Sequence, residues 1–577
     1  MTDRPGAAFA PRRAARDYDA IVIGSGMSGG WAAKELCERG LRTLVLDAGR
    51  PFDPVADARE HVPPWEMRFR GLGDRRATEA RQPVQRRSVS FDEQSARFWI
   101  DDAVHPYTTA EGRPFNYFRP SHVGGKSIMW GRQVYRLSDA DLGANLRDGV
   151  GVDWPVRYAE LAPWYDHVER YIGVSGQAER LASLPDGVFL PPMAMTPPER
   201  HLRDRVARAF GSARRVTIGR VAVLTRAHGG RAPCHYCGPC QRGCSTLSYF
   251  SSPNVTLPAA QGTGRMELRA NTVVREVVWD GRLGRVRGVR ALDAVSREEL
   301  EFTARVVFLC AGALESARLL LLSTSSAFPD GLANGSGQVG RNVMDHIKGA
   351  GASARFEGWD DVLPEGVRPN GIYLPSFRNA RADGRDRHAD FPRGYAFQGG
   401  AGRQDWRAHL AAPGLGAALK RALVEPGPWT FGWEARGEML PRESNRLTLH
   451  PTKVDPWGIP VAHFDVRWSD TELAMHRDMA RAAVEMLEAA GAVDIRPFER
   501  PSVPGSTNHE MGTTRMGRDP RTSVLDAYNR AHDVPNLFVT DGACMTSSPC
   551  QNPSLTYMAL TARAVDHAVR LLGRREL

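Results

Sequence analysis

The stretch that most constrains this chain is residues 20–49, which read AIVIGSGMSGGWAAKELCERGLRTLVLDAG. A short apolar run of the buried-strand type, residues 20–23, leads directly into the spacing G-x-G-x-x-G. A helix is expected from Trp31 to Glu38 and a second strand from Thr43 to Leu46, with Asp47 at the end of that strand. The three glycines of the motif are Gly24, Gly26 and Gly29.

Each part of this pattern suits a bound dinucleotide. The first glycine allows a sharp turn, the second lets the backbone approach a pyrophosphate, and the third lets the helix lie close to the strand. The helix N-terminus directs partial positive charge at the phosphates, and Asp47 is placed to hold an adenosine ribose hydroxyl. Because strand, helix, second strand and acid occur in order, we reject a glycine-rich turn without a ligand. The motif leaves FAD and NAD open, and the acid disfavours NADP.

The length of the chain and its changing patterns predict interleaved domains. A chain of 577 residues is too long for one hydrophobic core. We predict an α/β plus antiparallel β fold, in which a Rossmann-like domain is interleaved with a substrate domain built on an antiparallel sheet flanked by helices. The nucleotide domain is assigned residues 17–60, 105–150, 225–345 and 506–577, and the substrate domain 151–224 and 346–505. Residues 61–104 are expected to be an excursion that acts as a lid or a docking surface.

Charge and hydropathy limit the partners and the location. The net charge is +10, but the arginines are scattered among acids rather than gathered into a stripe, so no nucleic-acid partner is expected. No apolar run approaches the roughly 20 residues of a membrane helix, so no direct membrane span is expected. Arg12 and Arg13 are not followed by the apolar segment of a signal peptide. We expect a cytoplasmic protein, or a periplasmic one that a signal-bearing partner exports already folded.

Two further segments carry candidate cofactor-binding residues. In VGGKS, Gly124 and Gly125 suggest a second close backbone approach to a cofactor at the start of a helix, with Ser127 placed to donate hydrogen bonds, although an ordinary turn has the same pattern. Near the C-terminus, a strand over 537–540 ends in the turn Asp541-Gly542. Asn552 and Pro553 then fit the N-cap and first residue of a helix over 553–571, whose positive end would stabilise an anion such as a reduced flavin.

The cysteines point to a metal cluster. Four of the eight lie in APCHYCGPCQRGC with the spacing C-x2-C-x2-C-x3-C, and they are Cys234, Cys237, Cys240 and Cys244. This is the ferredoxin-type run for an iron–sulfur cluster, with Cys244 the least certain ligand. Structural zinc is the weaker alternative, because it usually takes two cysteine pairs separated by a longer loop. Disulfides between such near neighbours would be strained, and unliganded thiols come last. The other four cysteines are expected to be buried structural residues.

Six segments together resemble the glucose–methanol–choline (GMC) family of flavoprotein oxidoreductases. They are VIGSGMSGG near the N-terminus, VGGKS at 123–127, AGALESARLLL at 311–321, VGRNVMDH at 339–346, GEML and NRLTL within 437–449, and the C-terminal block from His509 to Asn552. The resemblance implies the GMC fold and FAD. It also implies that His509 takes the hydroxyl proton while the hydride passes to flavin N5, and that Asn552 hydrogen-bonds the same oxygen. Val274 matches the family's adenine contact.

Closer similarity lies within one branch of that family. HEMGTTRMG and QNPSLT are similar to the pyranose-oxidase, gluconate- and fructose-dehydrogenase branch, and the cysteine segment is similar to catalytic subunits of bacterial glucoside 3-dehydrogenases. This similarity implies oxidation of a glucoside at C3 to a 3-keto glycoside. It also implies electron transfer through a [4Fe–4S] or [3Fe–4S] cluster to a cytochrome-type acceptor, with a small partner subunit. Pyranose oxidases bind FAD through a histidine in the slot that Met129 holds here, so FAD should be non-covalent.

Two alternatives stay open. A sugar or C-glycoside oxidase would pass electrons to oxygen at the flavin, with the cysteines holding a structural metal. A non-redox lyase of the same fold would keep the flavin as a structural group. Peroxide formation in air would distinguish the oxidase from the dehydrogenase. Failure of every alcohol to reduce the flavin would indicate the lyase. Substrate specificity is expected to reside in residues 345–505, where the sequence identifies no particular residue.

Overall fold

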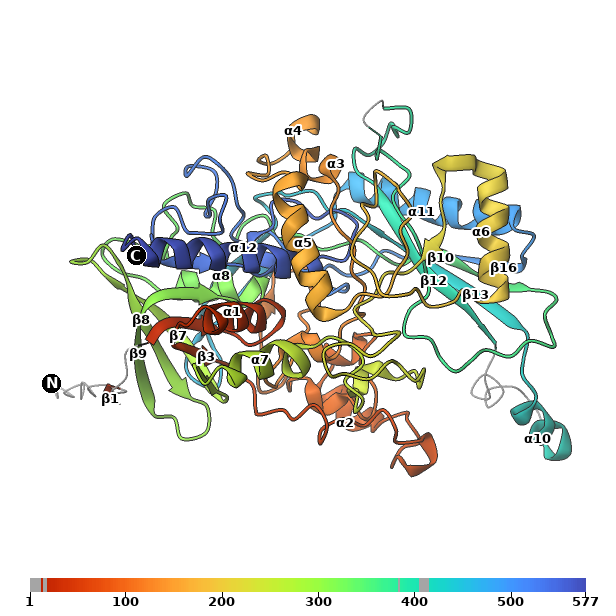
Figure 1. Ribbon diagram of the computed structural model, residues 1–577, viewed down its shortest axis with the longest axis horizontal. Helices are drawn as coiled ribbons and strands as arrows, with labels where there is room; N and C mark the ends of the chain where they lie inside the picture. Colours follow the sequence, from red (N-terminus) through yellow and green to blue (C-terminus); the bar gives the residue numbers. More distant parts are fainter. Residues whose placement is uncertain (1–11, 14–17, 382–383, 404–414) are drawn as a thin grey trace.

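A computed structural model of the chain describes residues 12–13, 18–381, 384–403 and 415–577. Figure 1 shows two parts: one with α1, α8 and α12 around a sheet at the left, and an antiparallel sheet with α6 and α11 at the right. The described helices are α1 (Met27–Glu38), α2 (Arg75–Arg81), α3 (Asp139–Leu142), α4 (Ala144–Asp148), α5 (Tyr158–Ile172), α6 (Pro197–Phe210), α7 (Leu257–Gly262), α8 (Ala313–Leu322), α10 (Gly416–Val424), α11 (Asp470–Ala489) and α12 (Ser554–Gly573).

The described strands form three sheets. They are β1 (Arg12–Arg13), β2 (Tyr18–Ile23), β3 (Thr43–Leu46), β4 (Thr108–Thr109), β5 (Thr217–Ile218), β6 (Met266–Arg269), β7 (Thr272–Asp280), β8 (Arg285–Asp293), β9 (Glu299–Leu309), β10 (Ala350–Phe356), β11 (Ile372–Leu374), β12 (Tyr395–Arg403), β13 (Trp429–Gly437), β14 (Arg446–Val454), β15 (Pro460–Asp465), β16 (Val493–Glu499) and β17 (Leu537–Val539).

The first sheet is eight-stranded and mostly parallel where it meets the glycine motif. Its order is β6-β3-β2-β9-β8-β7, and both β1 and β17 also pair with β9. Strands β6, β3, β2, β9 and β17 are parallel, whereas β9, β8 and β7 form an antiparallel meander. The crossover from β2 through α1 to β3 is the βαβ unit that residues 20–49 predict. This arrangement confirms the predicted fold class.

Helix α1 begins earlier than the sequence predicted, and its glycines pack tightly against neighbouring residues. It begins at Met27 rather than at Trp31, because its glycines continue the helix instead of ending the turn. A Cβ on Gly30 would lie 2.4 Å from Thr256 Oγ1, so only glycine fits this contact. Trp31 is fully buried, and its ring meets those of His167 and Tyr171 on α5 edge-on at 5.7 and 5.5 Å. Burying such a ring contributes about 2–3 kcal/mol to stability.

The second sheet presents one face to helix α11 and the other to the site described below. Its order is β16-β10-β13-β12-β11-β5, with antiparallel pairing throughout. Buried and half-buried residues alternate along β13, so Trp433 and Ala435 join the core under α11 while Glu434 and Arg436 point to the opposite face. The third sheet, β14-β15-β4, has three strands.

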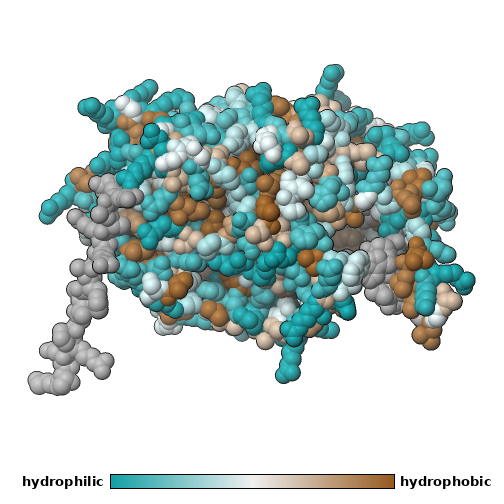
Figure 2. Space-filling model, turned by 60° about the horizontal axis from the view of Figure 1, so that its bottom comes forward, coloured by the Kyte–Doolittle hydropathy of each residue, from teal (hydrophilic) through white to brown (hydrophobic). Residues whose placement is uncertain are grey.

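The excursion at residues 61–104 lies against the cysteine segment. Asp92 accepts hydrogen bonds from Arg242 at 2.7 Å and Gln241 at 2.9 Å, and the Val62 carbonyl accepts one from Arg242 Nη1 at 3.4 Å. Figure 2 shows a face of the molecule on which hydrophobic residues lie in separate patches among hydrophilic ones. Whether the excursion is a lid or a docking surface stays a prediction, as do the domain boundaries. No helix within the described ranges is long and apolar enough to cross a membrane.

Candidate active site and cysteine pocket

A single cavity of about 660 Å³ connects most of the residues that the sequence singled out. The predicted residues that line it are Gly24, Gly26, Asp47, Gly125, Ser127, Val274, His509, Asp541, Gly542 and Asn552. Gly29, Gly124 and Pro553 lie just outside the lining. The cavity therefore joins the end of β3, the glycine turn, the second glycine pair and the start of α12 in one continuous space.

The glycine turn needs glycine for steric reasons. Gly24 has φ +94°, and a Cβ there would lie 2.4 Å from the Cys310 carbonyl oxygen. A Cβ on Gly29 would lie 1.8 Å from the Gly24 carbonyl oxygen, so this glycine sets the approach of α1 to the turn. Gly26 is the N-cap of α1 and has no capping side chain, so the first N–H groups of the helix remain available to an anion. The turn therefore fits the pyrophosphate role that the sequence predicts.

Hydrogen bonds join this turn to Asp47 and to the second glycine pair. Asp47 accepts from the Ser25 N–H at 2.9 Å and the Gly49 N–H at 2.7 Å, so its carboxylate organises the loop beside the cavity. Ser25 Oγ accepts from the Gly124 N–H at 2.9 Å, and Ser127 Oγ donates to the Gly124 carbonyl at 2.6 Å. The expected helix is a single 3₁₀ turn, Gly125–Ile128, entered through Gly124 at φ +91°.

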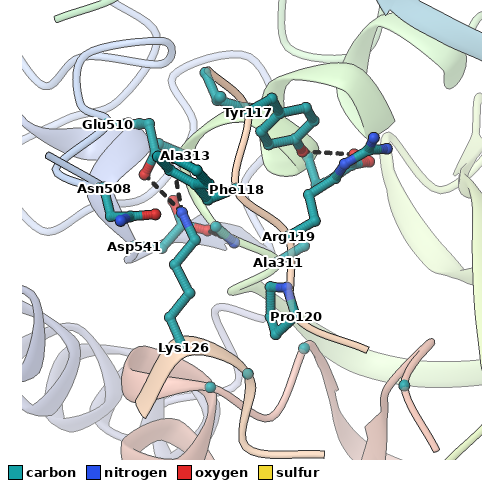
Figure 3. A pocket seen from close by; sticks show the side chains of 18 of the residues that line it. Tyr117, Phe118, Arg119, Pro120, Lys126, Ala311, Ala313, Asn508, Glu510 and Asp541 are labelled. Atoms are coloured by element: carbon teal, nitrogen blue, oxygen red, sulfur yellow. Dashed lines mark hydrogen bonds and ion pairs between the residues drawn. The ribbon is translucent and has the colours of Figure 1, made fainter. Parts of the chain in front are cut away.

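The wall near α12 is polar and suits a flavin ring. Lys126 points across the cavity to Glu510, with Nζ–Oε distances of 2.8 and 2.9 Å (Figure 3). The hydroxyl of Tyr557 and Oδ1 of Asn508 are buried without a hydrogen-bond partner, and both residues line the cavity. Unpaired buried polar atoms are costly, so these atoms fit a ligand with carbonyl and ring N–H groups, such as an isoalloxazine.

The neighbouring elements support the same assignment. Asp541 accepts from the Gly312 N–H at 2.9 Å and Ser316 Oγ at 2.5 Å, and burial raises its pKa to about 6. Helix α12 begins at Ser554 with Pro553 as its N-cap, one position later than predicted. Met129 is 3% exposed within an apolar cluster, and its thioether cannot form a histidyl link, which supports non-covalent FAD.

His346, which the sequence analysis did not single out, sets the protonation of His509. Nε2 of His346 lies 2.9 Å from the Pro549 carbonyl oxygen, which only accepts, so this nitrogen carries the proton. Burial lowers the pKa of His346 to about 4, so its ring is neutral and its Nδ1 is an acceptor. Nδ1 of His509, 2.9 Å away, therefore donates to it. This leaves Nε2 of His509 as a free base.

That free nitrogen faces Asn552. Nδ2 of Asn552 donates to Nε2 of His509 at 3.3 Å, and Gln398 Nε2 donates to Oδ1 of Asn552 at 2.5 Å, which holds the amide in this orientation. Burial lowers the pKa of His509 well below its ordinary value, and the positive charges of Arg436 and Lys348 lower it further. The structure brings the two predicted catalytic residues together as a neutral base and an amide donor.

Five residues of the site were missed by the sequence analysis: Asp345, His346, Lys348, Gln398 and Arg436. Asp345 accepts from the N–H groups of Thr507 and His509, both at 3.3 Å, and so holds the loop that carries the base. The segment VGRNVMDH, which ends at His346, carried the available signal, because it was among the segments that resemble the GMC family.

The four predicted cysteine ligands line a second, small pocket. None forms a disulfide, and Cys37, Cys310, Cys544 and Cys550 are buried as predicted. Burial and the neighbouring thiols raise the pKa of Cys237 to about 12, because adjacent thiolates repel each other unless a cation neutralises them.

The metal that the four thiols would hold stays a prediction. Within the described part of the chain, no group of three His, Cys, Asp or Glu side chains is arranged to hold a metal ion. The structure brings the four cysteines to one pocket, and an iron–sulfur cluster and structural zinc both remain open there.

Comparison with known proteins identifies the family. Family models described as GMC oxidoreductase match residues 18–348 and 441–561, so the chain belongs to the GMC oxidoreductase family. It is 28% identical to 2-methyl-1,2-propanediol dehydrogenase of Mycolicibacterium austroafricanum, over 96% of this chain and 95% of that one. It is 27% identical to the fructose dehydrogenase large subunit of Gluconobacter japonicus, over 95% and 97% of the two chains. The fold is similar to the solved pyridoxine 4-oxidase from Mesorbium loti, with a TM-score of 0.59, 17% identity and coverage of 96% and 99%.

These matches confirm the expected family and enzyme class. The chain is an FAD-dependent oxidoreductase that acts on CH–OH groups of alcohols or sugars.

Proposed function

We propose that this protein is a dehydrogenase that oxidises a secondary hydroxyl of a sugar or glycoside, at C3 of a glucoside, and passes the electrons to an external acceptor through an iron–sulfur cluster. The observation that carries the proposal is the unprotonated Nε2 of His509 beside the amide of Asn552, at the end of a cavity that also contains the dinucleotide cradle. The cysteine pocket supports the dehydrogenase over an oxidase, because an oxidase delivers electrons to oxygen at the flavin and needs no cluster.

The residues around the base have separable roles. A substrate hydroxyl placed between His509 and Asn552 donates its proton to Nε2 and accepts from the amide Nδ2, replacing the hydrogen bond between the two side chains. Gln398 keeps that amide group turned toward the base. Bound FAD supplies the hydride acceptor, N5, for the carbinol hydrogen. Loss of one proton and one hydride converts the alcohol to a ketone.

Electron exit is assigned to the four cysteines. Cys234, Cys237, Cys240 and Cys244 would hold the cluster, which carries electrons singly from flavin to acceptor. A small partner subunit and a cytochrome-type acceptor are part of the proposal, and the name of the Gluconobacter relative describes that protein as a large subunit. We place the protein in the cytoplasm, or in the periplasm if a signal-bearing partner exports it folded.

The first experiment is an anaerobic absorbance titration of the purified protein with methyl glucoside. The expected result is bleaching of the flavin band over a broad iron–sulfur absorbance, with no bleaching in His509→Ala. A flavin spectrum without the broad absorbance, bleached by sugar and restored by air with peroxide formation, would replace the dehydrogenase with an oxidase. Absence of bleaching by any sugar would refute the proposed reaction.

A further inference from the structure

Two cations, Lys348 and Arg436, lie on the wall of the cavity near the base, and both line it together with His509. Ile347 and Gly437 exchange both backbone hydrogen bonds, at 3.0 and 2.9 Å, so the two chains run side by side next to these cations. Burial and the nearby Arg436 lower the pKa of Lys348, so the two cations repel each other. Their persistence here therefore requires something to offset the repulsion.

The described residues supply only part of that offset. Lys348 forms no ion pair with any residue that the structure describes. Nη1 of Arg436 is buried without a hydrogen-bond partner, and Nη2 lies 3.6 Å from Glu434 Oε2, too far for a hydrogen bond. Lys126, in contrast, is fully paired with Glu510. Glu434 and Asp345 both act electrostatically on Lys348, but burial raises the pKa of Asp345 to about 7, so these carboxylates offset the two cations only in part.

The surroundings leave room for a ligand at these cations. On β13, Glu434 and Gly432 lie on the same face of the sheet as Arg436, and an added Cβ on Gly432 would meet nothing within 4 Å. Gln398 lies opposite Glu434 on the neighbouring strand β12, so amide and carboxylate groups that suit sugar hydroxyls lie beside the cations.

We propose that the substrate is an anionic sugar, a glycoside or sugar that carries a carboxylate, and that Arg436 and Lys348 bind this carboxylate while His509 and Asn552 hold the reacting hydroxyl. This inference rests on the proposed function and specifies its substrate class. A carboxylate brings a single negative charge to the positive charge that remains at this wall, and the guanidinium fork suits its two oxygens. A phosphate would bring close to two negative charges and leave one without compensation.

The test compares two substrates that differ only at C6. Methyl glucoside and methyl glucuronide have the same ring, and the second carries a carboxylate. Stopped-flow reduction of the bound FAD under anaerobic conditions yields a rate constant and a Kd for each sugar. We expect wild-type protein to bind the glucuronide at least about 10-fold more tightly. Arg436→Gln should weaken glucuronide binding about 10- to 100-fold and change glucoside binding less than about 2-fold.

Further variants exclude indirect effects. Lys348→Gln should produce the same selective loss, and Arg436→Lys should recover part of the binding, because it restores the charge without the fork. Arg355→Gln is the matched control, since Arg355 is 41% exposed, pairs with Asp494 and does not line the cavity. This control should leave both sugars unaffected, while circular dichroism shows whether each variant is folded.

The outcomes separate this inference from the proposed function. If wild-type protein reduces its flavin with both sugars at equal Kd, or if Arg436→Gln weakens both sugars equally, the carboxylate site is overturned and the sugar dehydrogenase stands. Preference for glucose 6-phosphate over glucuronide would also overturn the carboxylate. If neither sugar reduces the flavin, the proposed function fails. Perturbation of the flavin spectrum by glucuronide, present in wild type and lost in Arg436→Gln, would then still support the anion site, and no perturbation would refute it.

Discussion

Nδ1 of His509 and Nδ1 of His346 lie 2.9 Å apart, with the two rings at an interplanar angle of 84°. Because His346 carries its proton on the nitrogen that faces the Pro549 carbonyl, only one tautomer of His509 satisfies this contact. Nε2 of His509, the base in the proposed function, is therefore kept free by a residue that does not line the cavity. His346 is a positioning residue, and its removal should affect the rate of the reaction more than substrate binding.

His346→Phe tests this role. The variant keeps a flat ring but loses the acceptor, so His509 can adopt the tautomer that protonates Nε2. We expect the rate constant of flavin reduction to fall about 100-fold, within the range that a general base contributes, with little change in sugar Kd. His346→Asn, which offers an amide oxygen to His509, should recover part of the rate. A change in Kd at an unchanged rate constant would contradict the tautomer argument.

The environment of His509 predicts the pH dependence of the reaction. Its pKa is lowered by burial first and then by the positive charges of the neighbouring Arg436 and Lys348. A base works when it is neutral, so activity is present above its pKa and is lost as the pH falls through that value. The rate of flavin reduction by methyl glucoside should be flat above pH 6.5, with its acid limb well below that value. Lys348→Gln removes one cation and should move the limb to higher pH. A wild-type limb at or above pH 6.5 would contradict this electrostatic account.

Gly29 is predicted to be irreplaceable for FAD binding. A Cβ there would lie 1.8 Å from the Gly24 carbonyl oxygen, a backbone atom that cannot move without opening the turn. We expect Gly29→Ala to lower the free energy of unfolding by about 3 kcal/mol or more and to purify largely without FAD. Gly262→Ala on α7 is the matched control, because an added Cβ there meets nothing within 4 Å. The ratio of flavin to protein absorbance and the Tm measure both effects, and normal FAD content in Gly29→Ala would contradict the prediction.

The sequence was most informative where local pattern decides structure. Strand β3 has the predicted bounds, Thr43–Leu46. A short apolar run between a helix and an acidic residue leaves few alternative positions for the two ends of the strand. The start of α1 was placed too late, since glycines in the first turn of a helix usually indicate a break, and only the packing against Thr256 shows why they are tolerated.

The candidate site was predictable only in part, for a related reason. Gly24, Asp47, His509 and Asn552 lie in motifs that have a pattern of their own. His346 is 163 residues away from His509 along the chain, and Lys348 and Arg436 reach the same cavity wall from distant segments of the sequence. Register between distant strands depends on the folded sheet, so no local pattern in this sequence could identify those contacts.

The cysteine pocket leads to the last prediction. If Cys234, Cys237, Cys240 and Cys244 hold an iron–sulfur cluster, Cys240→Ser should purify with much less iron and lose the broad absorbance. Flavin reduction by sugar should continue at its wild-type rate, because His509 and Asn552 are untouched, whereas reduction of an external one-electron acceptor should fall. Cys244→Ser addresses the cluster type, since a three-iron cluster that needs only three thiolates would survive this change. Cys37→Ala, at a cysteine buried beside α7, is the matched control and should retain iron. Wild-type protein without iron, or Cys240→Ser with unchanged iron and acceptor reduction, would remove the cluster from the proposed electron path.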